Sequence, residues 1–88
     1  MASQLFEEKA KAVNGLATTP STDELLKLYS LYKQATVGDV NVERPGIFNI
    51  KDRKKWDAWN ELKGTLTQEE AEQQYISFVD ELIAKYNN

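Results

Sequence analysis

Four stretches of the chain carry apolar residues at the spacing of an α-helix. The first helix is expected to begin near Ser3 and to weaken at Gly15. Its apolar side consists of Leu5, Phe6, Val13 and Leu16. Ser21 and Glu24 then have the Ser-x-x-Glu spacing of a capping box, which predicts a second helix from this point to about Thr36.

A long loop and a third helix follow. No helical or strand period persists from Val37 to Lys51, so we expect a loop there, and loops of this length in small domains are often functional. The spacing predicts a third helix from about Asp52 to Leu62, after which Gly64 can form a left-handed cap. Trp56 and Trp59 lie three residues apart on this helix, and we expect them to anchor the core.

The fourth helix differs from the second in the width of its apolar face. Thr67 and Glu70 form its capping box, and its apolar residues span an arc of about 140°, close to the single stripe that packing on one core requires. The second helix has an arc of about 220°, from Leu31 through Leu25 to Leu26. Such a helix is either buried on two sides or shows leftover apolar and aromatic surface to a ligand, and the sequence leaves both open.

The fold class that these patterns predict is all-α. Strand alternation and internal repeats are absent from the sequence, and no stretch resembles a linker between domains. We therefore expect one domain over residues 1–88, built as a four-helix bundle.

Charge adds a feature that the apolar pattern does not explain. The net charge is -3, but four of the five residues from Lys51 to Lys55 are basic and stand where the third helix begins. The positive end of a helix disfavours cations in its first turn, so this run is either a solvated charged turn or the site of a bound anion. Tyr29, Tyr32 and Lys33 add rings that can stack and a cation on the same helix, which favours one compact phosphate-bearing ligand over core tyrosines with exposed hydroxyls.

Composition excludes several classes of chemistry. The chain has no His and no Cys, so it can form no Ser-His-Asp triad, no Cys-His pair, no disulfide and no ordinary zinc site. We expect no metal, no cofactor and no enzymatic activity. No run approaches the ~20 apolar residues of a membrane span, and acids interrupt the only apolar stretch near the N-terminus, unlike a signal peptide. A soluble cytoplasmic protein is expected, and the negative net charge argues against nucleic acid as a partner.

Two motifs resemble the acyl-CoA-binding protein family. YKQATVGD occupies Tyr32 to Asp39, KWDAWNELKG occupies Lys55 to Gly64, and Arg44-Pro45-Gly46 lies between them. The resemblance covers essentially the whole chain and is strongest to the small cytosolic members of fungi. The family often has a basic residue where this chain has Asn14, and the connection after Thr65 is one residue longer than in many relatives.

The resemblance implies both a topology and a function. The helices would run up-down-down-up and would bind medium- and long-chain acyl-CoA thioesters one to one with high affinity. The protein would act as an intracellular carrier and pool former in lipid metabolism, as a monomer without stable membrane insertion, and with transient contacts to enzymes that use acyl-CoA. By similarity, the ligand-binding residues are Asn14, Tyr29, Ser30, Leu31, Tyr32, Lys33, Lys55 and Tyr75.

Within this set the resemblance distinguishes several roles. Four residues match the positions that hold the adenine and 3′-phosphate end of coenzyme A, and Tyr75 completes that site. These four are Tyr29, Tyr32, Lys33 and Lys55. Ser30 and Leu31 lie within the stretch that contacts the ligand.

A different class of function remains open when the resemblance is set aside. The wide second helix could dock a partner helix, as in a helical protein-interaction module. The two hypotheses make opposite predictions for Lys33 and Lys55, which matter little to a partner helix but bind phosphate in an acyl-CoA site.

Overall fold

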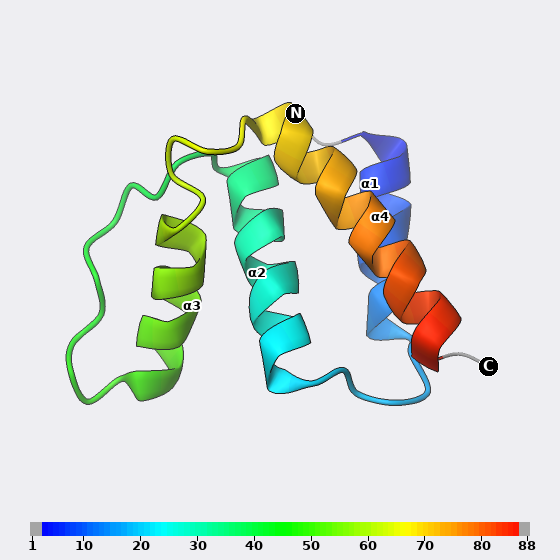
Figure 1. The fold of residues 1–88 in the computed structure, drawn as a ribbon, viewed down its shortest axis with the longest axis horizontal. Coiled ribbons are helices and arrows are strands. Elements are labelled where there is room, and N and C mark those ends of the chain that lie inside the picture. Colours follow the sequence, from blue (N-terminus) through cyan, green and yellow to red (C-terminus); the bar gives the residue numbers. More distant parts are fainter. Residues whose placement is uncertain (1–2, 87–88) are drawn as a thin grey trace.

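Four helices make up the computed structural model, which describes residues 3–86 (Figure 1). They are α1 (Gln4–Asn14), α2 (Thr22–Thr36), α3 (Ile50–Asn60) and α4 (Gln68–Tyr86). Figure 1 shows α2 and α3 running in the same direction, while α1 and α4 run in the opposite one. The expected all-α bundle with up-down-down-up order is therefore confirmed.

Side-chain caps fix where the helices begin. Ser3 Oγ accepts a hydrogen bond from the Phe6 amide at 3.1 Å and opens α1. Ser21 and Glu24 form the expected capping box, in which each side chain accepts from the other residue's amide. Thr67 and Glu70 form a second capping box of the same kind at the start of α4. Because these bonds satisfy amides that a helix leaves free, the local sequence alone determines the starting points.

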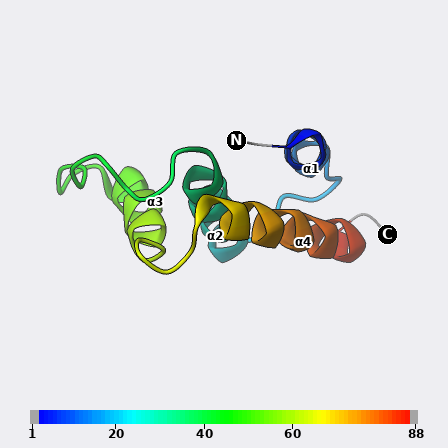
Figure 2. The same ribbon diagram turned by 90° about the horizontal axis from the view of Figure 1, so that it is seen from above.

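The helices pack with α2 in the centre. It contacts α3 on one side and α4 on the other, and α1 lies against α4 (Figure 2). The core forms where α1, α2 and α4 meet, and its buried residues are Phe6, Leu28, Leu31, Ala35, Ala71, Tyr75, Ile76, Val79 and Leu82. The 220° apolar arc of α2 thus serves two neighbouring helices, yet Leu25 and Tyr32 remain 44% and 41% exposed. Burial on two sides therefore accounts for most of the wide arc, and some apolar and aromatic surface is left exposed on α2.

Both tryptophans of α3 fasten the long connection 37–49 to the bundle. The indole Nε1 of the buried Trp59 donates to the Gly38 carbonyl at 2.9 Å, and that of Trp56 donates to the Val42 carbonyl at 2.8 Å. Arg44 adds a bidentate ion pair with Asp57, at 2.9 and 2.8 Å. The prediction that Trp59 anchors the core is confirmed, whereas Trp56 is half-buried and holds the connection at the surface.

Two helix boundaries differ from the expectation. The third helix begins at Ile50 rather than Asp52, because the backbone already turns where the Asn49 amide donates to the Gly46 carbonyl at 2.9 Å. It also ends at Asn60, and Gly64 takes its left-handed conformation, with φ of 73°, in the turns that follow. Among residues 3–86, no helix has both the length and the hydropathy to cross a bilayer.

Candidate ligand-binding cleft

A cleft of about 520 Å³ opens between the N-terminal halves of α2 and α3. Its lining residues are Thr22, Leu25, Leu26, Tyr29, Lys51, Lys54 and Lys55. Two leucines of α2 form an apolar wall, and three lysines of α3 line the other side of the cleft. A site of this composition suits a ligand that is an anion at one end and apolar at the other.

Tyr29 and Lys55 are brought together inside this cleft. The Lys55 Nζ lies 5.3 Å from the centroid of the Tyr29 ring, which is within the range of a cation–π contact. The pair joins the middle of α2 to the middle of α3, because these two helices pack side by side in parallel. An aromatic face and an ammonium group therefore stand next to each other at a surface opening.

Lys33 extends this face by one helical turn. It follows Tyr29 by four residues, so both side chains project from the same side of α2. The Lys33 Nζ lies 5.1 Å from the Trp59 ring centroid, so its stem packs toward α3. Tyr29, Lys33 and Lys55 form one row along the boundary of the two helices.

Tyr32 and Tyr75 belong to a neighbouring aromatic cluster. The Tyr32 ring stacks on Phe6 at 5.5 Å between centroids and lies 5.9 Å from Tyr75, and Phe6 lies 4.8 Å from Tyr75. These rings come from α1, α2 and α4, and the exposed Tyr32 lines a second pocket of about 370 Å³ against α1. Tyr32 follows Tyr29 by three residues on α2, so the aromatic cluster begins about one helical turn from the Tyr29–Lys55 cleft.

The Tyr75 hydroxyl is held as a neutral donor. The side chain is only 4% exposed, and burial, followed by the nearby Tyr32, raises the pKa of Tyr75 to about 12. Among the described residues, no hydrogen-bond partner of this hydroxyl is found. A phenol in this state can donate to a ligand oxygen at any physiological pH.

Three other predicted residues do not line the cleft. Leu31 is buried in the core, and the buried Ser30 donates its hydroxyl to the Lys27 carbonyl at 2.9 Å. Asn14 is exposed at the C-terminal end of α1 and lines neither of the two pockets described above. Their direct contact with a ligand stays a prediction, while the structure gives Ser30 and Leu31 a part in holding α2.

Sequence reasoning missed several residues of the cleft wall. Leu25 and Leu26 appeared only as members of a wide apolar arc, and Lys51 and Lys54 only as members of a basic run. The leucines of the apolar arc and the lysines of the basic run belong to one site. Only the packing of α3 on α2 places them on opposite sides of the same cleft.

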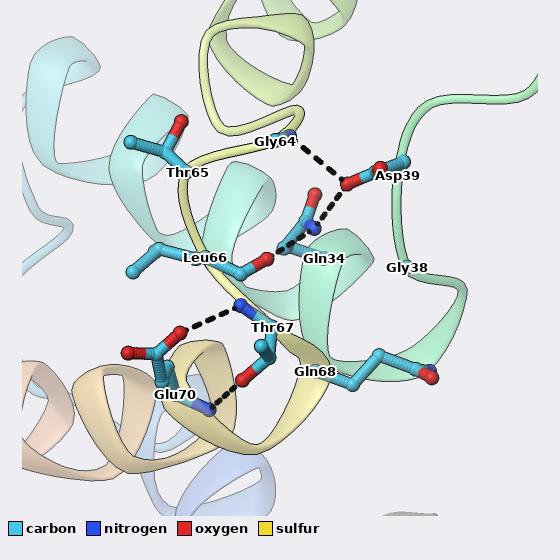
Figure 3. A pocket seen from close by; sticks show the side chains of 9 residues that line it. All are labelled: Gln34, Gly38, Asp39, Gly64, Thr65, Leu66, Thr67, Gln68 and Glu70. Carbon is cyan, nitrogen blue, oxygen red and sulfur yellow. Dashed lines mark hydrogen bonds between the residues drawn. The ribbon is translucent and has the colours of Figure 1, made fainter.

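A more polar pocket of about 350 Å³ lies near the other end of α2 (Figure 3). There Gln34 Nε2 donates to Asp39 Oδ1 at 2.9 Å and to the Leu66 carbonyl at 2.8 Å, and the Gly64 amide also donates to Asp39 at 3.3 Å. The hydrogen bond from Gln34, followed by that from Gly64, lowers the pKa of Asp39. The pocket contains none of the predicted site residues, and its hydrogen bonds join lining residues to one another, although the buried Gln34 Oε1 has no partner among residues 3–86. We interpret it as the joint that ties the end of α2 to the connection before α4.

Comparison with known proteins agrees with the resemblance drawn from the motifs. Residues 3–79 match the family model described as acyl CoA binding protein. The chain is 70% identical to the acyl-CoA-binding protein of Saccharomyces cerevisiae over 88 residues, which is the full length of both chains. The crystal structure of Oryza sativa acyl-CoA-binding protein 2 superposes with a TM-score of 0.88 at 50% identity, covering 93% of this chain and 90% of that one. The solution structure of the yeast protein gives a TM-score of 0.78 at 70% identity, covering 99% and 100%.

Proposed function

The chain belongs to the acyl-CoA-binding protein family, whose members are non-enzymatic binding proteins, and from this premise we propose that it binds medium- and long-chain acyl-CoA thioesters one to one with high affinity. It then serves as an intracellular carrier and pool former for these esters. The observation that carries the proposal is the cleft in which the leucines of α2 face the lysines of α3 beside Tyr29.

The apolar wall supplies the affinity for the acyl chain. Leu25 is 44% exposed, so a hydrocarbon chain lying on it and on Leu26 removes apolar surface of both the ligand and the protein from water. Burial is worth ~0.8 kcal/mol per methylene. Half of a 16-carbon chain would therefore contribute roughly 6 kcal/mol before the cost of ordering the ligand.

The row of Tyr29, Lys33 and Lys55, called the polar row below, supplies the affinity for the nucleotide end of the ligand. Lys33 and Lys55 bind phosphate oxygens by charge-assisted hydrogen bonds, and the Tyr29 and Tyr32 rings offer faces on which the adenine can stack. The neutral Tyr75 hydroxyl donates to the same end of the ligand. We assign Ser30 and Leu31 to the support of this row, and Asn14 to an uncharged outer contact at the end of α1.

Calorimetric titration tests this function. Palmitoyl-CoA should bind at a ratio of one, far more tightly than free coenzyme A or palmitate, because each of these lacks one half of the contacts. A folded protein that gives no heat with palmitoyl-CoA would overturn the proposal and would favour the partner-helix alternative. Equal affinity for the thioester and palmitate would show that the polar row does not bind the nucleotide.

The wider setting of the protein is also part of the proposal. We infer that residues 1–88 act as one acyl-CoA-binding domain, that the chain is a monomer, and that it works in the cytoplasm and contacts acyl-CoA-using enzymes transiently. The absence of Cys from the sequence suits a reducing compartment. Sedimentation velocity at two protein concentrations tests the monomer, and imaging of a fluorescent fusion tests the compartment.

A further inference from the structure

The end of the connection 37–49 and the first residue of α3 form an apolar tip, which consists of Ile47, Phe48 and Ile50. Their exposed fractions are 68%, 93% and 64%. Within residues 3–86, the side-chain hydrogen bonds and the ion pair that attach the connection to α3 involve no connection residue after Arg44, so the tip lies beyond the attached part. Single exposed apolar residues are common, but three within four positions on one projecting turn form a patch that a binding partner usually covers.

Basic residues stand directly behind this tip. Lys51, Arg53, Lys54 and Lys55 occupy the first two turns of α3, and Asp52 is the one acid among residues 51–55. The tip and the basic turns share the lower end of α3 in Figure 1, at one end of the molecule. Apolar side chains that enter the headgroup region, with cations beside them at the level of the phosphates, are the pattern of reversible binding to an anionic bilayer.

We propose that the apolar tip and the basic turns of α3 form a docking surface for anionic lipid bilayers. Phe48 enters the headgroup region with its two isoleucine neighbours, and Lys51 and Lys54 contact lipid phosphates. The positive charge of these turns favours an anionic bilayer as the partner, because an apolar tip alone would fit a protein surface equally well. The contact is peripheral and requires no helix that spans the membrane.

Docking in this orientation has a consequence for the cargo. Lys51, Lys54 and Lys55 line the acyl-CoA cleft as well as flanking the tip, so a docked molecule holds the cleft beside the lipid surface. An acyl chain can then pass between bilayer and cleft with little exposure to water. This transfer of the acyl chain rests on the proposed function. Docking of the protein without acyl-CoA does not depend on that function.

Sedimentation with large unilamellar vesicles tests the docking surface. The unliganded protein is mixed with vesicles of phosphatidylcholine alone or with about 30% phosphatidylserine, at low and at physiological salt. Binding should require phosphatidylserine and weaken as salt rises. Phe48→Ser should lower the partition coefficient about tenfold, and the double variant Lys51→Ala with Lys54→Ala should lower it roughly fivefold per residue. Leu5→Ser is the matched control, because it removes an apolar side chain of 49% exposure from α1 and should change nothing.

Several results would overturn the docking surface. They are no binding of the wild type to phosphatidylserine vesicles, equal binding to both kinds of vesicle, and equal binding by Phe48→Ser. Titration of Phe48→Ser with palmitoyl-CoA in vesicle-free buffer completes the test. Unchanged affinity supports docking, whereas weakened affinity would place Phe48 in the ligand site instead. If the wild type fails to bind palmitoyl-CoA, the proposed function fails, while the vesicle result still decides the docking surface.

Discussion

At the residue scale, the two lysines that we propose as ligands of the nucleotide, Lys33 and Lys55, have no carboxylate partner among residues 3–86. Among the described residues, the ion pairs use Lys9, Arg44 and Lys85, and none of them involves Lys33 or Lys55. Both lysines instead lie over aromatic rings, at 5.1 and 5.3 Å from the centroids. An incoming phosphate can therefore bind them without first breaking a salt bridge.

Replacing Lys55 by Ala should weaken palmitoyl-CoA binding about ten- to a hundredfold, because a hydrogen bond between charged groups contributes ~1.5–3 kcal/mol. Lys33→Ala should have an effect of the same order. Calorimetric titration measures both. Lys63→Ala is the control, since this lysine lies in the turns after α3 and does not line the cleft. Equal affinities for Lys55→Ala and the control would contradict the assignment.

The two indole hydrogen bonds allow a matched comparison of stability. Trp59→Phe keeps an aromatic ring but leaves the carbonyl of the buried Gly38 without its donor, so the free energy of unfolding should fall by about 1–3 kcal/mol. Trp56→Phe removes the bond to the exposed Val42, where water can replace the donor, and should cost less than about 1 kcal/mol. Urea unfolding of the two variants measures the difference. A larger loss for Trp56→Phe would show that the surface attachment carries more of the stability.

At the element scale, Glu24 connects the start of α2 to the end of α4. Its carboxylate accepts from the Ser21 amide at 2.9 Å, from the Tyr86 hydroxyl at 2.5 Å and from Lys85 Nζ at 2.9 Å. The hydrogen bond from Tyr86, followed by those from Lys85 and Ser21, lowers the pKa of Glu24 from 4.5 to about 2. A capping residue of one helix thus also fixes the neighbouring helix.

This link should make stability depend on acid. Because the pKa of Glu24 is lower in the folded state, its contribution is complete above about pH 4.5 and is lost as the pH falls toward 2. Glu24→Gln should unfold more easily at pH 7, and its free energy of unfolding should fall less than that of the wild type between pH 4.5 and 2. Urea unfolding across this range measures both. Glu81→Gln, an exposed change on α4, is the control and should show the same pH dependence of unfolding as the wild type. The same dependence for Glu24→Gln would mean that the link contributes nothing to stability.

The limits of the helices were more predictable than the site between them. Ser21 and Thr67 start their helices through bonds to residues three positions away, so the local sequence contains the whole cause. The start of α3 was predicted two residues late because the turn at Gly46 shows no capping pattern. Leu25 and Lys55 could be recognised as surplus apolar surface and surplus charge, but only tertiary packing makes them opposite walls of one cleft.

At the scale of the whole molecule, the fold combines a core of three helices with a fourth helix, α3, that packs outside this core. The core lies among α1, α2 and α4, whereas α3 contacts α2 alone among the helices of residues 3–86. The cleft lies at this single contact. A ligand that bridges α2 and α3 therefore adds contacts at the single interface that holds α3 to the other helices.

Ligand binding should stabilise the fold strongly. At a free concentration one hundred times the dissociation constant, palmitoyl-CoA should add ~2.7 kcal/mol to the free energy of unfolding. For a domain of 88 residues this raises the melting temperature by about 10–20 °C. Circular dichroism melts with palmitoyl-CoA and with free coenzyme A at the same concentration measure the effect. Identical melts in the two ligands would mean that the acyl chain makes no contact with the folded protein.

The most direct measurement of the central claim is an amide chemical-shift map of the isotope-labelled protein during titration with palmitoyl-CoA. We expect the largest changes along the cleft, in residues 22–33 of α2 and 51–55 of α3, with saturation at one equivalent. The polar joint around Gly64 and Leu66 should change little. Changes concentrated at that joint, with Tyr29 and Lys55 unaffected, would contradict binding of acyl-CoA in the cleft between α2 and α3.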